Sequence, residues 1–111
     1  MKRGDVVAIA DRVGDFTGKP RPGVIVQSDL FGALDSVTIC PLTSTPQDSP
    51  ATRLRIEPSA ELTLRTASWI AVDKITSVRR GRIGPSIGQL AAEDLQRLNG
   101  AIAVIDQALR Q

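Results

Sequence analysis

Histidine is absent from the sequence, and its absence restricts the chemistry that the protein can perform. An imidazole is the usual general base near neutral pH, the usual partner of a nucleophilic serine or cysteine, and the commonest zinc ligand. The chain also has a single cysteine, so an internal disulfide is impossible and a transition-metal site is not expected. Any catalysis must therefore use arginine, lysine, carboxylate, hydroxyl or backbone groups.

Long apolar runs and aromatic residues are scarce as well. No stretch of about 18 apolar residues is present to span a bilayer, and the N-terminus lacks the pattern of a signal peptide. We therefore expect a cytoplasmic protein. The apolar neighbours of Cys40 predict a buried thiol with no activating partner. Phe16 stands in a polar loop, where it either folds back onto the core or offers a stacking face to a base or a partner.

What is present describes an ordinary globular protein. The 111 residues fit one domain, 1–111, with 41% apolar and 23% charged residues and a net charge of only +2. The basic residues include two groups, namely Arg53, Arg55 and Arg65, and Arg79, Arg80 and Arg82. Such groups are compatible with binding a phosphate backbone, although solvated surface charge is their commoner meaning.

Short β-branched stretches separated by turns rich in glycine and proline predict strands through most of the chain. We expect strands at 4–10, 24–26, 36–42 and 52–57, a second strongly apolar run at 67–78, and a short bent strand within 80–88. Pro41 has no N–H to donate, which predicts a sheet edge or a bulge at this position. Trp69, within the apolar run, is expected to fill the core.

The pattern changes near residue 91, where apolar residues recur at steps of three and four and predict one apolar face of a helix. The residues of this face are Leu95, Leu98, Ile102, Ile105 and Leu109. Gly100 lies within the expected helix and is interpreted as a point of close approach to the sheet. Short strands followed by an amphipathic helix predict a mainly β fold, a small barrel or strongly curved sheet that the helix plugs.

The stretch 19–28 is the most informative part of the sequence. Arg21 stands between Pro20 and Pro22, and each proline fixes its own φ and pushes the preceding residue toward an extended conformation. The β-branched residues that follow predict a buried strand, so Arg21 is expected at a rigid point where the strand leaves its loop. A permanently charged, forked donor there suits a phosphate or a carboxylate. The alternative is a surface ion pair at the strand edge.

Four motifs, in their order along the chain, resemble those of the MazF/PemK toxins of toxin–antitoxin systems. They are Lys2-Arg3-Gly4-Asp5-Val6 at the first strand, Arg21-Pro22 before Val24-Ile25-Val26, Pro41-Leu42-Thr43-Ser44 at the end of the third strand, and Asp73-Lys74-Ile75 late in the fifth. The ordered set, together with the expected terminal helix, covers almost the whole chain.

The resemblance implies an SH3-like barrel, the curved sheet of the CcdB and PemK toxins, with five to seven strands and a C-terminal amphipathic helix, working as a homodimer. It implies a metal-independent endoribonuclease without a cofactor. Such an enzyme cleaves single-stranded RNA, including mRNA, at short motifs and leaves cyclic-phosphate and 5′-hydroxyl ends. The implied partner is a MazE-like antitoxin whose acidic, partly hydrophobic tail enters the substrate groove.

The functional arginine and threonine of this family match Arg21 and Thr43. Attack by a ribose 2′-hydroxyl on the neighbouring phosphorus concentrates negative charge on the phosphoryl oxygens, and Arg21 is suited to neutralise it. Thr43 is suited to donate to a phosphoryl oxygen or to position the leaving group; alternatively, it caps the turn before Pro46. The general base stays open, because the pKa of arginine is too high for that role.

The loops 12–20 and 44–51 match the loops that contact substrate in the family. Many relatives carry a carboxylate near Phe16, whereas this chain has Asp15 one place earlier, so Asp15 is the candidate for a general base or for an acceptor that recognises a nucleobase. The other candidate RNA contacts are Thr17, Lys19, Gln27, Ser44 and Lys74. Some relatives have glutamine at the position of Lys74, which here either holds a phosphate or is a solvated lysine at a strand end.

Two other functions are compatible with the same fold. One is a toxin without enzymatic activity that binds DNA gyrase, like the CcdB toxins, and the other is an inactive SH3-like binding module. The chain ends in Ala-Leu-Arg-Gln, without the tryptophan-bearing tail expected of the gyrase-binding class. The presence of both Arg21 and Thr43 favours the nuclease over either alternative.

Overall fold

The computed structural model describes residues 1–46 and 48–110, with the side chain of Phe31 excepted. Within them the chain forms seven strands, one long helix and three short 3₁₀ turns. The strands are β1 (Asp5–Ile9), β2 (Arg21–Ile25), β3 (Ser36–Thr43), β4 (Arg53–Ile56), β5 (Ser68–Ala71), β6 (Thr76–Arg79) and β7 (Ile83–Gln89). The helix is α1 (Ala92–Leu109), and the turns are η1 (Asp29–Phe31), η2 (Val72–Lys74) and η3 (Arg80–Arg82).

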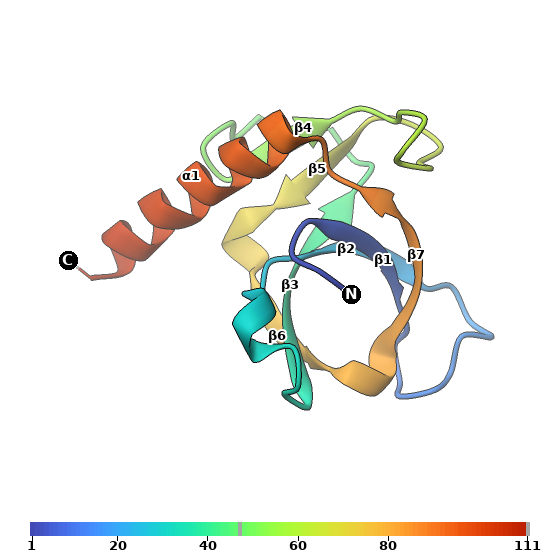
Figure 1. Cartoon of the computed structure of the whole chain (residues 1–111). Coiled ribbons are helices and arrows are strands. Elements are labelled where there is room, and N and C mark those ends of the chain that lie inside the picture. Colours follow the sequence, from blue (N-terminus) through green and yellow to red (C-terminus); the bar gives the residue numbers. More distant parts are fainter. Residues whose placement is uncertain (47, 111) are drawn as a thin grey trace.

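The strands form one antiparallel sheet that curls into a barrel-like ring (Figure 1). Their order is β4-β5-β3-β2-β1-β7, and β6 pairs with β3. β3 is the centre of the sheet, because it pairs with β2 along one side and with β6 and then β5 along the other. α1 lies beside β4 and β5, and its C-terminal end projects beyond the ring (Figure 1). The prediction of a mainly β, curved sheet followed by a C-terminal helix is confirmed.

Alternation along the central strands gives the molecule two apolar clusters, one on each face of the sheet. Val6 and Val24 point to the face that α1 covers, where the fully buried Leu98 of the helix joins them. Their neighbours Val7 and Ile25 point to the other face, where residues of β6 and β7 complete the second cluster. Both faces of these strands are buried, which explains their continuous apolar sequence.

The apolar face predicted for the helix packs as expected over most of its length. Leu95, Ile102 and Ile105 are half-buried around Leu98. Leu109 is 80% exposed, because the last turns of α1 extend past the sheet (Figure 1). In the part of the chain that the structure describes, no helix is long and apolar enough to cross a membrane.

Gly100 is not a point of close approach, contrary to the prediction. It is exposed, and a Cβ at this position would meet open space. The close approach occurs instead at Gly88 in β7, whose φ is +141° and whose missing Cβ would collide with the backbone of Glu61 and Leu62. Glycine at this position lets β7 meet the segment 61–64, and Gln89 N–H donates to the Glu61 carbonyl at 3.1 Å beside it.

The predicted sheet edge or bulge at Pro41 is wrong. Pro41 lies in the central strand β3, paired with Gly23 of β2. It falls between residues 36–39, which pair with β6, and residues 42–43, which pair with β5. A strand that changes partner at this point accommodates a residue without an N–H, and the sequence of β3 alone does not show where its partners change.

The predicted positions of Trp69 and of Asp73-Lys74 are also wrong. Trp69 is only partly buried in β5 and belongs to neither apolar cluster, while the next residue, Ile70, is fully buried. Asp73 and Lys74 lie in η2 and not in a strand, because the apolar run 67–78 divides into β5, η2 and β6. Alternation within β5 therefore points the tryptophan away from the cluster that α1 covers.

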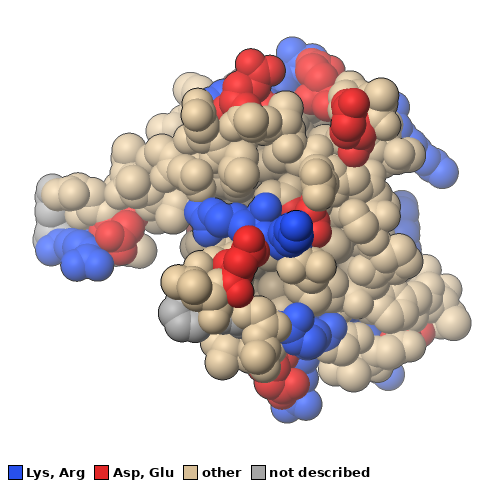
Figure 2. All heavy atoms as spheres, viewed as in Figure 1, with Lys and Arg blue, Asp and Glu red and all other residues tan. Residues whose placement is uncertain are grey.

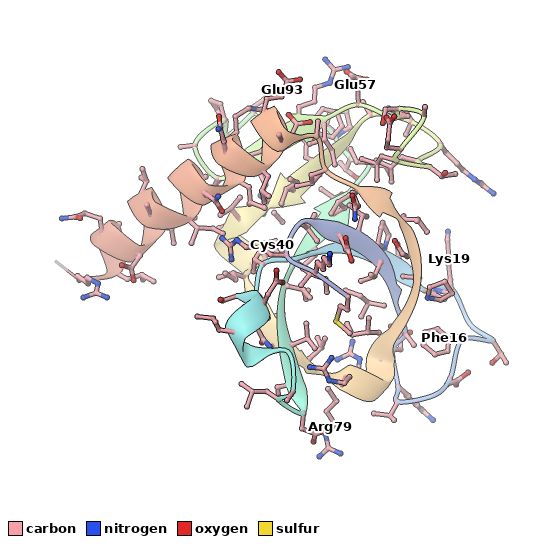
Figure 3. All side chains as sticks on the ribbon, in the orientation of Figure 1. Phe16, Lys19, Cys40, Glu57, Arg79 and Glu93 are labelled. Carbon is pink, nitrogen blue, oxygen red and sulfur yellow. The ribbon has the colours of Figure 1, made fainter. Side chains whose placement is uncertain are left out.

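Phe16 and Cys40 take the positions expected from their surroundings. The Phe16 ring lies over Gly84 of β7, so the loop residue folds back onto the sheet with 37% of its surface exposed (Figure 3). Cys40 is fully buried in β3, and burial raises the pKa of its thiol to about 11. The thiol therefore stays protonated at neutral pH and does not act as a nucleophile.

Candidate functional site

Arg21 is the first residue of β2 and projects from the end of this inner strand. Its backbone pairs with Ile9 of β1, and the following Pro22 pairs with Ala8. The side chain is exposed, and no described residue forms an ion pair or a hydrogen bond with its guanidinium. The surface ion pair considered for this arginine is therefore absent from the described part of the chain, and the guanidinium is available to an anion.

The larger of two hollows beside Arg21 has a volume of about 480 Å³ and lies between the start of β2, the end of β3 and the segment 63–65. Three cations and three hydroxyl groups line it: Lys19, Arg21, Arg65, Ser44, Thr63 and Ser68. No carboxylate among the described residues does so. Figure 3 shows Lys19 on the outer side of the ring, and Figure 2 shows positive side chains along that edge. The hollow therefore favours an anionic ligand.

The second hollow, of about 230 Å³, lies between the first three strands and β6. Arg21 and Arg82 line it together with Asp11 and the hydroxyl groups of Thr76 and Ser77. Arg82 Nε donates to a backbone carbonyl oxygen at 2.7 Å, which fixes the position of this side chain. Asp11 is thus a carboxylate that shares a hollow with Arg21.

The register of β2 and β3, extended beyond its last pair, places Thr43 opposite Arg21. β2 and β3 pair Gly23 with Pro41, and continuing this antiparallel register by two residues brings Arg21 to Thr43. Residues that face each other in this way project from the same face of the sheet, with Cβ atoms about 5 Å apart. Two residues far apart in the sequence are therefore neighbours at one end of the β2–β3 pair.

The Thr43 hydroxyl is held in place by the turn that follows β3. Its Oγ1 accepts a hydrogen bond from the Thr45 N–H at 3.2 Å, so the capping role considered from the sequence is present. A hydroxyl that accepts one bond still has its O–H to donate. Capping and donation to a ligand are thus compatible, and the cap orients the donor.

Asp15 is held by Thr17 and lines neither hollow. Its Oδ1 accepts hydrogen bonds from the Thr17 hydroxyl at 2.6 Å and from the Thr17 N–H at 3.1 Å. These bonds, with the hydroxyl as the larger cause, lower the pKa of Asp15 below its ordinary value of 3.8. A lower pKa makes the carboxylate a weaker base, so the geometry favours Asp15 as a hydrogen-bond acceptor over Asp15 as a general base.

The arrangement as a whole is suited to a phosphodiester. A rigidly placed guanidinium offers two parallel donors, an oriented hydroxyl lies opposite it, and further cations line the adjoining hollow. The sequence model of the family described as PemK-like, MazF-like toxin of type II toxin–antitoxin system matches residues 2–105. The chain belongs to this family.

A curated relative and several solved structures agree with this membership. The probable endoribonuclease MazF of Mycolicibacterium smegmatis is 43% identical over 104 residues, which are 94% of this chain and 94% of the relative. The Mycobacterium tuberculosis toxin MazF-mt6 has a TM-score of 0.72 at 27% identity and covers 90% of this chain and 92% of its own. The MazE–MazF complex (Form-II) of Deinococcus radiodurans shares the fold, with a TM-score of 0.72 at 20% identity over 95% of this chain and 93% of its own.

These matches confirm the resemblance inferred from the four motifs, and they also confirm the fold expected of a MazF/PemK toxin. They are to MazF toxins and endoribonucleases, and none of those described here is a gyrase-binding toxin or an inactive binding module. The interpretation as a nuclease toxin is therefore supported over the two alternatives.

Three of the predicted site residues line one hollow, and a fourth, Thr43, lines neither hollow but is the sequence neighbour of one of them. Lys19, Arg21 and Ser44 line one hollow, and Thr43 directly precedes Ser44 at the end of β3. Asp15 and Thr17 lie in the same loop as Lys19 but are bonded to each other.

Two predicted residues lie elsewhere. Gln27 follows the opposite end of β2 from Arg21, and its Oε1 accepts the Thr38 N–H at 3.1 Å, so it joins β2 to β3. Lys74 is exposed in η2 and lines neither hollow. Their proximity to the motifs in the sequence does not correspond to proximity in space.

Sequence reasoning did not single out Arg65, Arg82 or Asp11. Both arginines belonged to the basic groups, but those groups also contain arginines with structural roles: Arg80 donates to the Leu34 carbonyl at 2.8 Å, and Arg53 pairs with Asp73 at 2.9 Å. The spacing of arginines in the sequence does not distinguish those that line a hollow from those that have structural roles. Figure 2 shows the consequence, since positive and negative side chains lie together in small groups among the uncharged residues that cover most of the visible face.

Proposed function

We propose that this chain is a metal-independent endoribonuclease that cleaves single-stranded RNA, including mRNA, with Arg21 and Thr43 acting on the phosphate. The observation that supports it most is the Arg21 guanidinium, which has no partner among the described residues and lines a hollow together with Lys19 and Arg65. The extended register of β2 and β3 places Thr43 opposite it. A phosphodiester carries its charge on oxygens that match the spacing of the guanidinium donors.

The proposed reaction needs no cofactor and conserves every atom. The ribose 2′-oxygen attacks the adjacent phosphorus and forms a new P–O bond, and the bond from phosphorus to the 5′-oxygen breaks. The 2′-hydroxyl proton passes to a base, and the departing 5′-oxygen takes up a proton. The products are a cyclic phosphate and a 5′-hydroxyl. Arg21 stabilises the charge that develops on the phosphoryl oxygens, and Thr43 donates to one of them or to the 5′-oxygen.

Asp11 is better placed than Asp15 to accept the 2′-hydroxyl proton. Asp11 lines a hollow together with Arg21, whereas Asp15 lines neither hollow and is bonded to Thr17. A general base must lie within reach of the proton that it removes before its pKa matters. We therefore assign Asp11 to this role and Asp15 to contacts of the loop with RNA.

The partner that we propose is an antitoxin with an acidic tail. The family consists of toxins of type II toxin–antitoxin systems, and carboxylates suit the same cations as a phosphate does. Lys19, Arg21 and Arg65 would then pair with the tail in the inhibited complex and with RNA in the active enzyme.

We further propose that the protein is a homodimer located in the cytoplasm, where mRNA is available. Among the described residues, six large apolar side chains are more than half exposed, namely Met1 (55%), Val13 (56%), Leu30 (90%), Leu34 (52%), Val104 (62%) and Leu109 (80%). Leu34 lines an open hollow together with Ile75 and Ile102, and apolar groups gathered in one place are typical of surfaces that a second protein covers. A reduced, buried Cys40 is compatible with the cytoplasm.

Incubation of the purified protein with a long single-stranded RNA in EDTA tests this function. We expect discrete cuts at a short recurring motif, with 5′-hydroxyl ends that a polynucleotide kinase labels directly. Cuts that appear only after a divalent cation is added would contradict the metal-independent mechanism. A folded protein that makes no cuts in either condition would contradict the nuclease itself and favour a gyrase-binding toxin or a binding module.

A further inference from the structure

One row of residues crosses the sheet beside the proposed cleavage pair. Strand pairing joins Ile9 to Arg21, Thr43 to Trp69, and Trp69 to Arg55. The pairing of β2 with β3 ends at Gly23 and Pro41, and its register, extended by two residues, brings Arg21 to Thr43. Residues paired across antiparallel strands project from the same face. Trp69 and Arg55 therefore share a face with Arg21 and Thr43.

Trp69 is not part of the core on this face. Its neighbour Ile70 in β5, and Leu54 and Ile56 in β4, point to the cluster that α1 covers. Trp69 and Arg55 consequently point the other way, where the indole is partly buried and the guanidinium is exposed. A large aromatic ring on an open sheet face next to a phosphate-binding arginine is the arrangement on which single-stranded nucleic acids stack their bases.

The Arg55 guanidinium lies over the indole, with its central carbon 5.8 Å from the ring centroid. Arg55 also pairs with Glu57 at 2.9 Å, and these two side chains are 60% and 63% exposed. An ion pair so exposed contributes little, so a nucleic-acid phosphate competes with it readily. Trp69 and Arg55 together thus offer a π-face and a positive charge at one point.

We propose that Trp69 and Arg55 form a nucleobase platform, on which one base of the RNA stacks beside the phosphate that Arg21 and Thr43 cleave. This inference rests on the proposed nuclease function and adds a specificity-determining site to it. Neighbouring strands lie about 4.8 Å apart, which puts Trp69 about 10 Å from Arg21 across the sheet. A base held there selects which phosphate lies at Arg21, so the platform influences the choice of cleavage site.

The fluorescence of Trp69 provides the first test, because it is the only tryptophan in the chain. We expect a mixed-sequence 2′-O-methyl RNA oligonucleotide, which lacks the attacking hydroxyl, to quench this fluorescence in a saturable way. Arg55→Ala should weaken the apparent affinity by roughly tenfold. Arg79→Ala, which removes an exposed arginine of β6 (labelled in Figure 3), should not, because Arg79 pairs with Ser36 at the other end of β3 from Thr43.

Three results of this titration would overturn the platform. They are the absence of any quenching, an equal loss of affinity in the two arginine variants, and quenching by a poly-glutamate peptide but not by the oligonucleotide. The last result would assign the face to an acidic protein partner instead of RNA.

Cleavage mapping separates the platform from the nuclease. Trp69→Leu retains Arg21 and Thr43, so we expect it to cut the same long RNA roughly tenfold more slowly and with a relaxed preference at one position of the motif. Trp69→Phe keeps an aromatic ring and should retain the preference, and its folding can be compared with the wild type by circular dichroism. An unchanged motif and rate in a folded Trp69→Leu protein would overturn the platform and leave the nuclease standing.

A failure of the nuclease function can also be distinguished from a failure of the platform. If the wild-type protein cuts no RNA, the nuclease function is wrong. A saturable quench of Trp69 by the oligonucleotide would then still support the platform as an RNA-binding site, and no quench would overturn it.

Discussion

Arg21 shows which properties of a functional side chain follow from local sequence. The prolines on both sides restrict the backbone whatever the rest of the chain does, so an extended, rigid position was predictable. The absence of a partner for its guanidinium among the described residues was not, because that depends on where the acidic residues of other segments lie. The same holds for Thr43. Its hydrogen bond from the Thr45 N–H depends on neighbouring residues and was predictable, whereas its position opposite Arg21 depends on the pairing of β2 with β3 and was not.

The assignment of the general base predicts different effects for two carboxylates of one loop. Asp11→Asn should slow the chemical step by roughly a hundredfold or more, because a positioned base contributes an effect of that size. Asp15→Asn should leave that step nearly unchanged, since its carboxylate is bonded to Thr17 outside both hollows. Single-turnover cleavage of one RNA by both variants measures this. A larger loss in Asp15→Asn than in Asp11→Asn would reverse the assignment.

The contact between Asp15 and Thr17 also predicts a titration. Thr17→Ala removes the hydroxyl that is the larger cause of the lowered pKa of Asp15, so this pKa should rise toward 3.8. Because the pKa is lowered in the folded state, the contact stabilises the fold at neutral pH, and this contribution is lost as the pH falls below about 4. An NMR titration of the Asp15 carboxyl carbon measures the change. An unaltered pKa in the variant would show that another group holds the carboxylate.

At the scale of elements, a strand could be predicted where its own residues determine how it is buried. It could not be predicted where its burial depends on which strands pair with it. The apolar stretches of β1 and β2 are buried on both faces and were correctly placed. Pro41 was predicted to lie at a sheet edge or a bulge because the residues around it do not show that β3 changes its partner from β6 to β5 at this point. Trp69 was predicted to lie in the core because the residues around it in the sequence are apolar, and this pattern does not show that one face of β5 is less buried than the other.

Two glycines in neighbouring elements predict opposite effects of the same substitution. Gly100→Ala should stabilise the protein by about 1 kcal/mol, since alanine favours a helix and the position faces open space. Gly88→Ala should destabilise it by about 1–3 kcal/mol, since its φ is +141° and a Cβ would meet the backbone of Glu61. Denaturant unfolding at fixed protein concentration compares the two. Equal effects would contradict the assignment of the close approach to β7.

At the scale of the whole molecule, the fold was predictable because the ordered motifs and the terminal helix together cover the chain, as the family match over residues 2–105 confirms. The site was predictable only in part. Lys19, Arg21 and Ser44 line one hollow, and Thr43 directly precedes Ser44. Gln27 and Lys74 line neither hollow beside Arg21, because curling of the sheet decides which strand ends meet. The net charge of +2 did not indicate an anion-binding site, because the charge that matters is local. The larger hollow beside Arg21 is lined by cations and by no described carboxylate.

The proposed homodimer predicts a concentration-dependent change of molecular mass. Val104→Glu places a charge among exposed apolar groups of α1, where the native side chain is 62% exposed. It should shift the protein toward the monomer without unfolding it, because nothing in the described fold covers this part of the helix. Sedimentation equilibrium of the wild type and the variant measures the masses. A wild-type protein that is monomeric at all concentrations would contradict the dimer.

The cleavage rate of Arg21→Ala, measured in EDTA on one RNA beside Thr43→Ala and Arg79→Ala, tests the central claim most directly. We expect Arg21→Ala to lose activity by roughly 10²–10³-fold, because it removes the donor that meets the developing phosphoryl charge. Thr43→Ala should lose activity to a smaller extent. Arg79→Ala should cut at the wild-type rate, because Arg79 is exposed and pairs with Ser36 at the other end of β3 from Thr43. A folded Arg21→Ala protein that cuts as fast as Arg79→Ala would contradict the claim that Arg21 is the centre of the active site.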